Sequence, residues 1–163
     1  MSFLEKTLKE IIFTADRNKL EERGLFINGK LFRQLNIGNY GIADLVEVSK
    51  IDPYFGSHGL DITVYELKKD KIGISAFMQA VRYIKGIERY LEWRGFSNEV
   101  FYHIVLIGST LEDSFDSSFK YFPDMFPCNS DGSYFIRNYT YKYEIDGISF
   151  NEENGYKLIN QGF

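Results

Sequence analysis

Cysteine and histidine are scarce in this chain. Its one cysteine, Cys128, excludes a disulfide within the chain. Two histidines, His58 and His103, and one cysteine are too few for the Cys/His cluster of a structural zinc site. Any metal ion that the protein binds must therefore be held by oxygen ligands.

Long apolar runs are missing as well. No stretch approaches the roughly 20 apolar residues that cross a bilayer. The opening segment, MSFLEKTLKEII, carries charges where a signal peptide needs an apolar centre. We therefore expect a cytoplasmic protein that has no membrane-spanning segment and no membrane partner.

Apolar and aromatic residues are plentiful, at 44% and 17% of 163 residues. This composition and length predict one globular domain over residues 1–163. The net charge of −4 argues against a protein that coats nucleic acid through its overall charge. Because salt screens exposed charges beyond about 8 Å, binding of a polyanion would have to use local basic patches.

The first part of the chain alternates between helical and extended patterns. Leu4, Leu8 and Ile11 form one apolar stripe, which predicts an amphipathic helix with Ser2 as its N-cap. The polar segment DRNKLEERG indicates a short helix or loop that closes at Gly24. Next, LFRQLNI and GIADLVEV predict two strands joined by a turn around IGNYG, and DITVYELKK predicts a third.

The apolar period changes to that of a helix at Ser75, the expected N-cap. Apolar residues then recur at Phe77, Ala80, Ile84, Ile87 and Leu91. VFYHIVLIG predicts a strand buried on both faces, TLEDSFDSSFKYF a helix, and SYFIRNYTYKYEIDGISF two strands with a turn at DG. This order predicts an α/β domain with a mixed central β-sheet flanked by helices.

Three ionisable residues, Asp44, Glu66 and Lys68, stand at strand positions among apolar neighbours. Alternate side chains of a strand share a face, so Glu66 and Lys68 are expected on one side of the sheet. The short connection between their strands favours pairing, which would bring Asp44 near Glu66. Two neighbouring carboxylates repel each other unless a cation lies between them, and oxygen ligands of this kind suit Mg²⁺, with Mn²⁺ as an alternative.

A lysine beside such a metal has a chemical use. Its ammonium can orient a water or stabilise the negative charge that develops as a phosphodiester is attacked, while the metal activates water and polarises the phosphoryl oxygen. Hydrolysis of phosphodiesters is therefore the chemistry that this set of residues indicates.

The segments ADLVEV and YELKK together resemble the active-site signature of the PD-(D/E)xK nuclease superfamily, with Ala43 where the name of the motif has proline. The resemblance covers about residues 1–108 and implies a restriction-endonuclease-like αβββαβ core, with 109–163 as a C-terminal extension. It implies Mg²⁺-dependent hydrolysis of nucleic acid, with DNA as the expected substrate.

The same resemblance implies roles for single residues. Asp44 and Glu66 would be metal ligands together with the Leu67 carbonyl, and Lys68 would be the catalytic lysine. Gln79, followed four residues later by an aromatic residue, would support the lysine and the substrate backbone. Glu5 would be the carboxylate of the N-terminal helix, with Glu10 as a second candidate.

Each of these residues also has a plainer interpretation. Asp44 fits a turn or edge-strand carboxylate, and Glu66 with Lys68 fits a solvated ion pair on an antiparallel sheet. Gln79 fits a structural amide bonded to a neighbouring tyrosine. His103, inside an apolar strand, is more typical of a satisfied core histidine than of a ligand.

A basic stripe on the helix that follows the Glu-x-Lys strand is the expected contact with phosphates. The candidate nucleic-acid-binding residues are Lys69, Lys71, Arg82, Lys85 and Arg89. A solvated helix face explains the stripe equally well. Two competing classes therefore stay open: a non-catalytic binding or assembly module on the nuclease fold, with a second copy or another protein as partner, and a structural protein in which ELK occurs by chance.

Overall fold

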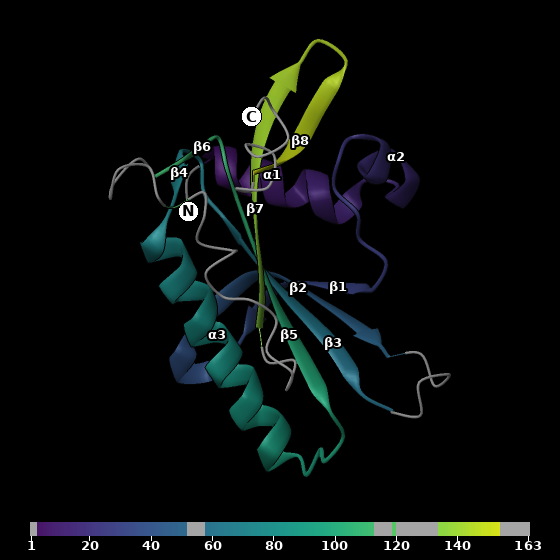
Figure 1. The fold of residues 1–163 in the computed structure, drawn as a ribbon, viewed down its shortest axis with the longest axis vertical. Helices are drawn as coiled ribbons and strands as arrows, with labels where there is room; N and C mark the ends of the chain where they lie inside the picture. The colour runs from purple at the N-terminus through teal and green to yellow at the C-terminus, as the bar shows by residue number, and fades with distance from the viewer. Residues whose placement is uncertain (1–2, 52–57, 113–118, 120–133, 154–163) are drawn as a thin grey trace, which may run out of the picture.

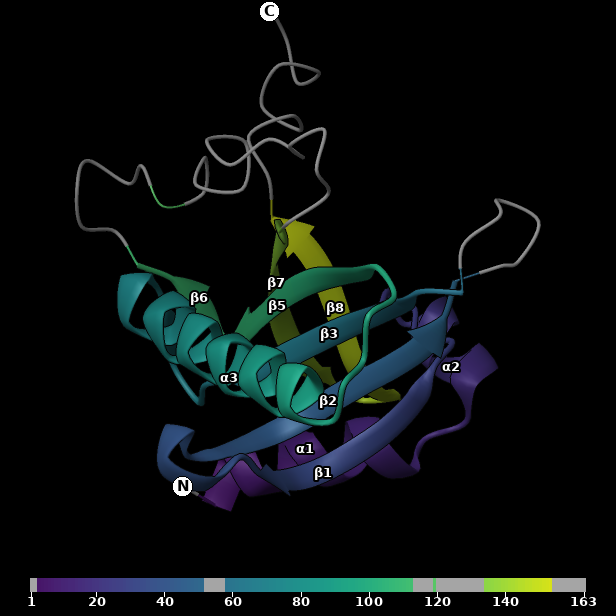
Figure 2. The ribbon, with the colours of Figure 1, turned by 90° about the horizontal axis from the view of Figure 1, so that it is seen from below.

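A computed structural model describes residues 3–51, 58–112, 119 and 134–153 of the chain. A six-stranded sheet forms the middle layer, with helix α3 on one face and helices α1 and α2 on the other (Figures 1 and 2). The prediction of an α/β protein with a mixed central sheet is thereby confirmed. Within the described residues, no helix combines the length and apolar character needed to cross a membrane.

From α1 to β5 the helices and long strands follow the predicted order, and β7 and β8 follow as the predicted last two strands. The elements are α1 (Phe3–Thr14), α2 (Arg17–Glu22), β1 (Lys30–Asn36), the 3₁₀ helix η1 (Gly38–Tyr40), β2 (Ile42–Lys50), β3 (Leu60–Leu67), β4 (Lys71–Ile72), α3 (Ile74–Trp93), β5 (Val100–Gly108), β6 (Thr110–Leu111), β7 (Tyr134–Glu144) and β8 (Gly147–Glu153).

The sheet has the order β1-β2-β3-β5-β7-β8. The first three strands form an antiparallel meander, as their short connections require. Helix α3 is the crossover that makes β5 parallel to β3, and β7 is parallel to β5. Strand β8 returns antiparallel to β7, so residues beyond 108 extend the same sheet.

Alternation along β3 divides the core into two clusters. Ile62 and Val64 pack toward α3, whereas Tyr65 and Leu67 pack toward α1 and α2. A strand buried on both faces alternates between two apolar layers instead of between core and water. The face toward α3 is the one that holds the candidate site.

Helix α3 begins before Ser75, and the prediction that Ser75 caps it is wrong. The N-cap is Gly73, which makes no side-chain capping bond, and the Ile74 N–H donates to Glu112 Oε2 at 2.9 Å. A Cβ at Gly73 would overlap the Glu112 side chain, so glycine lets this carboxylate lie close to the helix N-terminus. The negative charge at the helix N-terminus comes from a residue 38 positions away, which a local pattern does not reveal.

Part of the predicted helix in TLEDSFDSSFKYF is also wrong. Thr110 and Leu111 form β6, which pairs in parallel with β4 in a second, two-stranded sheet. Residues 113–118 and 120–122 lie outside the described part, as do Ser2 and residues 52–57 of the loop between β2 and β3. The predicted hairpin near the C-terminus is confirmed by β7 and β8.

Candidate active site

The register of β2 and β3 brings two predicted carboxylates together. Leu45 lies opposite Tyr65 and Val46 opposite Val64, so continuing the register by one residue places Asp44 opposite Glu66. Directly opposed residues of an antiparallel pair project to the same face, with Cβ atoms about 4.5–5.5 Å apart. Val64 packs toward α3, whereas Tyr65 and Leu67 pack away from it, so alternation puts Glu66 on the α3 face. On β2, Ala43 and Val46 both pack toward α3, so strict alternation is interrupted between them, where Asp44 and Leu45 lie.

Glu66 and Lys68 form an ion pair at the end of β3. Lys68 Nζ lies 3.0 Å from Glu66 Oε1, and the two side chains are 31% and 2% exposed. The Lys68 N–H donates to the Ile107 carbonyl of β5, which fixes the backbone just beyond the strand. A carboxylate buried to this degree is costly unless a cation offsets its charge. The interpretation of this pair as a solvated surface contact is therefore wrong for Glu66.

Gln79 connects the lysine to helix α3. Its Oε1 accepts from Lys68 Nζ at 3.2 Å, and its Nε2 donates to the Tyr83 hydroxyl at 2.7 Å. An ammonium has only donors, so the amide oxygen must face Lys68 and the amide nitrogen is left for Tyr83. Both expected partners of Gln79 are present at once. The result is a continuous chain of contacts through Glu66, Lys68, Gln79 and Tyr83.

Two backbone features shape the strands around this site. Gln34 of β1 has a positive φ of 50°, and the pairing of β1 with β2 is interrupted there, between the pairs Arg33–Leu45 and Leu35–Ala43. Positive φ is unusual for a residue with a side chain and locally twists the strand pair. On the helix, a Cβ at Gly86 would overlap Ile37 and Tyr40, so glycine lets the turn between β1 and β2 lie close against α3.

The oxygen atoms at this site match the ligands that Mg²⁺ prefers. Asp44 is half-buried and Glu66 is 1% exposed, and Leu67 is the last residue of β3, with its side chain buried toward α1. Two carboxylates and a carbonyl are a hard-oxygen donor set. No group of three or more His, Cys, Asp and Glu side chains in the described residues is arranged to hold a metal, so any ion here would need the backbone carbonyl or water as well.

The two glutamates predicted on the N-terminal helix have different outcomes. Glu5 belongs to α1, and its side chain lies outside the described part of the chain. Glu10 is engaged by Arg33 of β1, whose Nη1 lies 2.6 Å from Glu10 Oε2. That ion pair lies at the surface and joins α1 to the edge strand.

The predicted basic stripe lies along the exposed side of α3. Arg82 and Arg89 are exposed, and the Arg82 guanidinium lies 5.6 Å from the centre of the Tyr83 ring. Lys85 is paired with Glu88 at 3.0 Å, which reduces its local charge. Nearer the Glu-x-Lys strand, Lys69 and Lys71 are both exposed. Their contact with nucleic acid stays a prediction.

A polar network holds Glu47 on the opposite face of the sheet, and its partners were not predicted from the sequence. Glu47, 7% exposed, accepts from the backbone N–H groups of Asn28 and Gly29 at 3.1 and 2.7 Å and from the Tyr65 hydroxyl at 2.6 Å. Burial, and then the Glu47 carboxylate, raise the pKa of Tyr65 well above 10, so the phenol stays protonated and donates. The network ties the loop before β1 to the sheet.

We expect Tyr65→Phe to lower the free energy of unfolding by roughly 1–3 kcal/mol, because Glu47 Oε2 would lose its donor in a buried position. Urea unfolding followed by circular dichroism measures the loss. Tyr143→Phe is the matched control, because Tyr143 is 50% exposed and this change should leave the midpoint unaltered. Equal midpoints for both variants would show that the Tyr65–Glu47 bond adds nothing to stability.

Two more polar residues lie inside the fold. His103 of β5 pairs with Asp61 of β3 at 3.1 Å and stacks on Phe135 with ring centres 4.7 Å apart. Lys9 of α1 is only 2% exposed, and no local pattern marks a lysine for burial.

In comparisons with known proteins, no family model matches this chain, and neither a curated protein nor a solved structure matches it at a significant level.

Proposed function

We propose that the protein is a metal-dependent nuclease that hydrolyses phosphodiester bonds of nucleic acid, with DNA as the first candidate substrate. The observation that carries this proposal is the contact of Lys68 with both Glu66 and Gln79, at the end of β3 where the β2–β3 register, extended by one residue, brings Asp44 opposite Glu66. A buried carboxylate that is paired with a cation at the end of a strand marks a candidate functional site.

The order of the elements supports a restriction-endonuclease-like core. A helix, an antiparallel meander of three strands, a crossover helix and a parallel strand follow one another in this chain. This is the αβββαβ order that the resemblance to the PD-(D/E)xK superfamily implies. The carboxylate of the second strand, the Glu-x-Lys of the third and the glutamine of the crossover helix occupy the expected elements.

The residues have distinct tasks in the proposed reaction. The Lys68 ammonium places a positive charge where negative charge develops on the phosphoryl group. Gln79 holds Lys68 in that position, and its Nε2 is anchored by donating to the Tyr83 hydroxyl. Asp44, Glu66 and the Leu67 carbonyl would hold Mg²⁺, which supplies a Lewis acid for the phosphoryl oxygen and acidifies nearby water.

A plasmid-cleavage assay tests the proposal. The purified protein is incubated with supercoiled DNA, linear DNA and RNA at increasing Mg²⁺ or Mn²⁺, and the products are separated on gels. Cleavage that requires the metal and stops with a chelator is the expected result. No cleavage of any of these substrates with either metal would contradict the proposed function.

A non-catalytic binding module on the same fold is the second candidate. The observation that favours it is the 3.0 Å ion pair, because Lys68 already offsets the Glu66 charge without a metal. Titration calorimetry with Mg²⁺ and Mn²⁺ separates the two candidates. Heat of binding that disappears in an Asp44 variant supports the nuclease, and no measurable binding supports the module.

Nucleic acid should bind with a shallow dependence on salt. The net charge of −4 repels a polyanion, so contact must use the few basic groups of the stripe. If Arg82, Arg89 and the neighbouring lysines cover three or four phosphates, the slope of log affinity on log salt should be about −3 to −4. Arg82→Glu with Arg89→Glu should weaken binding and flatten this slope, measured by fluorescence anisotropy of labelled DNA.

The matched control is the pair Lys19→Glu and Lys142→Glu, which reverses two exposed cations away from α3. It changes the net charge by the same amount as the α3 variant. Equal affinity and slope for the two double variants would show that the stripe is a solvated helix face.

A further inference from the structure

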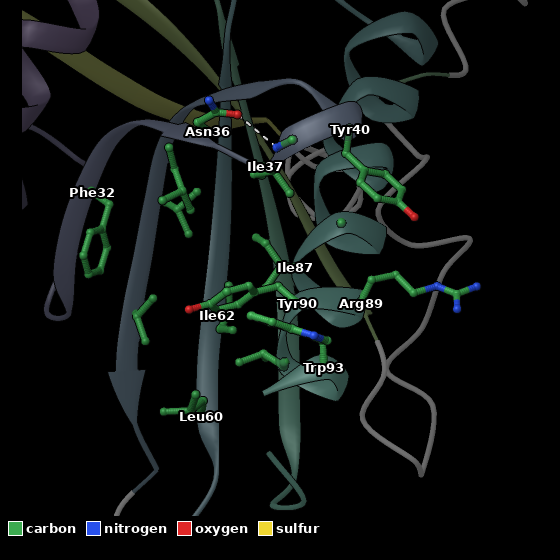
Figure 3. A pocket seen from close by; sticks show the side chains of 16 residues that line it. Phe32, Asn36, Ile37, Tyr40, Leu60, Ile62, Ile87, Arg89, Tyr90 and Trp93 are labelled. Atoms are coloured by element: carbon green, nitrogen blue, oxygen red, sulfur yellow. Dashed lines mark hydrogen bonds between the residues drawn. The ribbon is translucent and has the colours of Figure 1, made fainter. Parts of the chain in front are cut away.

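A large apolar cavity lies beside the candidate active site, between the C-terminal half of α3 and strands β1, β2 and β3 (Figure 3). Its volume is about 770 Å³, within the range of pockets that bind organic ligands. The walls are mostly aliphatic side chains such as Leu35, Val46 and Ile62, and Asn36 is one of few polar residues among them. An occupant of this space must therefore present apolar surface.

Two aromatic residues stand at the wall formed by α3. Tyr90 and Trp93 are 55% and 78% exposed, and their ring centres lie 6.2 Å apart. Figure 3 shows both rings extending from α3 toward β3, on the side where Ile62 lies. Large aromatic rings that stay exposed at the edge of a cavity provide faces on which another flat ring can stack.

The cavity and the candidate active site share one surface. On β3, Ile62 lines the cavity and Glu66 lies four residues further on the same face, about 13 Å away at the usual rise per residue. On α3, Gly86 lines the cavity and Tyr83 of the candidate site lies one helical turn before it. One ligand can therefore reach both places.

Charge favours an anionic polymer with apolar parts. Arg82 lies beside the candidate site, against the Tyr83 ring, and Arg89 lies beside the cavity. Figure 3 shows the Arg89 guanidinium directed away from the cavity to solvent. A strand whose bases entered the cavity would carry its phosphates outside, where these arginines lie. A basic edge beside an aromatic platform is the arrangement that binds single-stranded nucleic acid.

We propose that this cavity binds unstacked bases of a single-stranded nucleic-acid segment next to the phosphodiester that the candidate site cleaves. The inference rests on the proposed function and narrows its substrate class to nucleic acid with an unpaired segment. Because the walls offer few hydrogen-bonding groups, stacking and apolar contact dominate, and recognition tolerates different base sequences. Fully paired duplex should bind more weakly, since its bases are not available for stacking.

Trp93 is the only tryptophan of the chain, so its fluorescence reports on the cavity directly. We would titrate the metal-free protein with short oligothymidylate and with a duplex of equal length. Oligothymidylate should quench the fluorescence at lower concentrations than the duplex. Tyr90→Leu should weaken oligothymidylate binding roughly 5- to 150-fold, the range measured for loss of one stacking contact.

Tyr143→Leu is the matched control, because Tyr143 is similarly exposed on β7, away from the cavity, and should bind as the unmodified protein does. Unchanged fluorescence together with unchanged affinity in Tyr90→Leu would overturn the inference. So would a dimer, seen by sedimentation, that Tyr90→Leu and Trp93→Leu convert to monomers, because the cavity would then be an interface between two copies of the chain.

Binding is measured without metal and cleavage with it, so the two proposals fail separately. If the protein cleaves DNA while oligothymidylate leaves the Trp93 fluorescence unaffected, only the proposal that the cavity binds bases is contradicted. A protein that binds oligothymidylate through Tyr90 and Trp93 but cleaves no nucleic acid contradicts the nuclease proposal and supports the cavity.

Discussion

Replacing Lys68 with alanine is expected to lower DNA cleavage by about 10²–10³-fold, the usual loss when a group that stabilises transition-state charge is removed. The Lys68 ammonium lies 3.0 Å from Glu66 and 3.2 Å from Gln79, so it is held in place before any substrate arrives. The variant also loses the hydrogen bond that Lys68 Nζ donates to Gln79 Oε1. Rates are measured as initial velocities of plasmid nicking at saturating Mg²⁺.

The same change also acts on stability, and the assay must separate the two effects. Glu66 would lose the 3.0 Å contact with Lys68 in a position where its side chain is 2% exposed, which we expect to cost about 1–3 kcal/mol. Cleavage is therefore compared at a temperature where circular dichroism shows both proteins to be fully folded. Lys50→Ala is the control, because Lys50 is an exposed lysine at the far end of the strand that carries Asp44. Wild-type rates in Lys68→Ala would leave the Glu-x-Lys assignment without support.

Local patterns predicted the long elements of this fold because each repeats its signal several times. Alternation of apolar and polar residues indicates β3 from Leu60 to Val64, and the apolar stripe indicates α3 from Phe77 to Leu91. Strands β4 and β6 have two residues each, too few to show any period. Thr110 and Leu111 pair with Lys71 and Ile72, and this contact between distant segments decides their structure.

The candidate site was likewise predicted only where local spacing determines it. Glu66 and Lys68 were expected on one face from their spacing alone, and a helical wheel placed Gln79 near Tyr83. The burial of Lys9 and the capping of α3 by Glu112 depend on packing between distant segments. The cavity beside Trp93 was likewise hidden, because its walls come from three strands, a turn and a helix.

Asp44→Asn should strongly slow hydrolysis while sparing the binding of nucleic acid. The amide keeps the size of the carboxylate and removes one negative charge from the proposed metal ligands. We expect Mg²⁺ affinity to fall by at least about 100-fold, more than the loss of an outer-shell contact causes, and cleavage to fall by about 10²–10³-fold. Calorimetry measures the first loss and plasmid nicking the second.

Binding of nucleic acid should persist in this variant because the proposed contacts with phosphates and bases come from other residues, such as Arg82, Arg89 and Tyr90. Fluorescence anisotropy with labelled single-stranded DNA, in metal-free buffer, checks this part. Asp61→Asn is the matched control, because Asp61 is also an aspartate of the β2–β3 meander, but it pairs with His103 at 3.1 Å. If Asp61→Asn and Asp44→Asn cleaved DNA equally well, the position of Asp44 opposite Glu66 would have no catalytic meaning, and the ion pair of Glu66 with Lys68 would be a means of burying charge within the sheet.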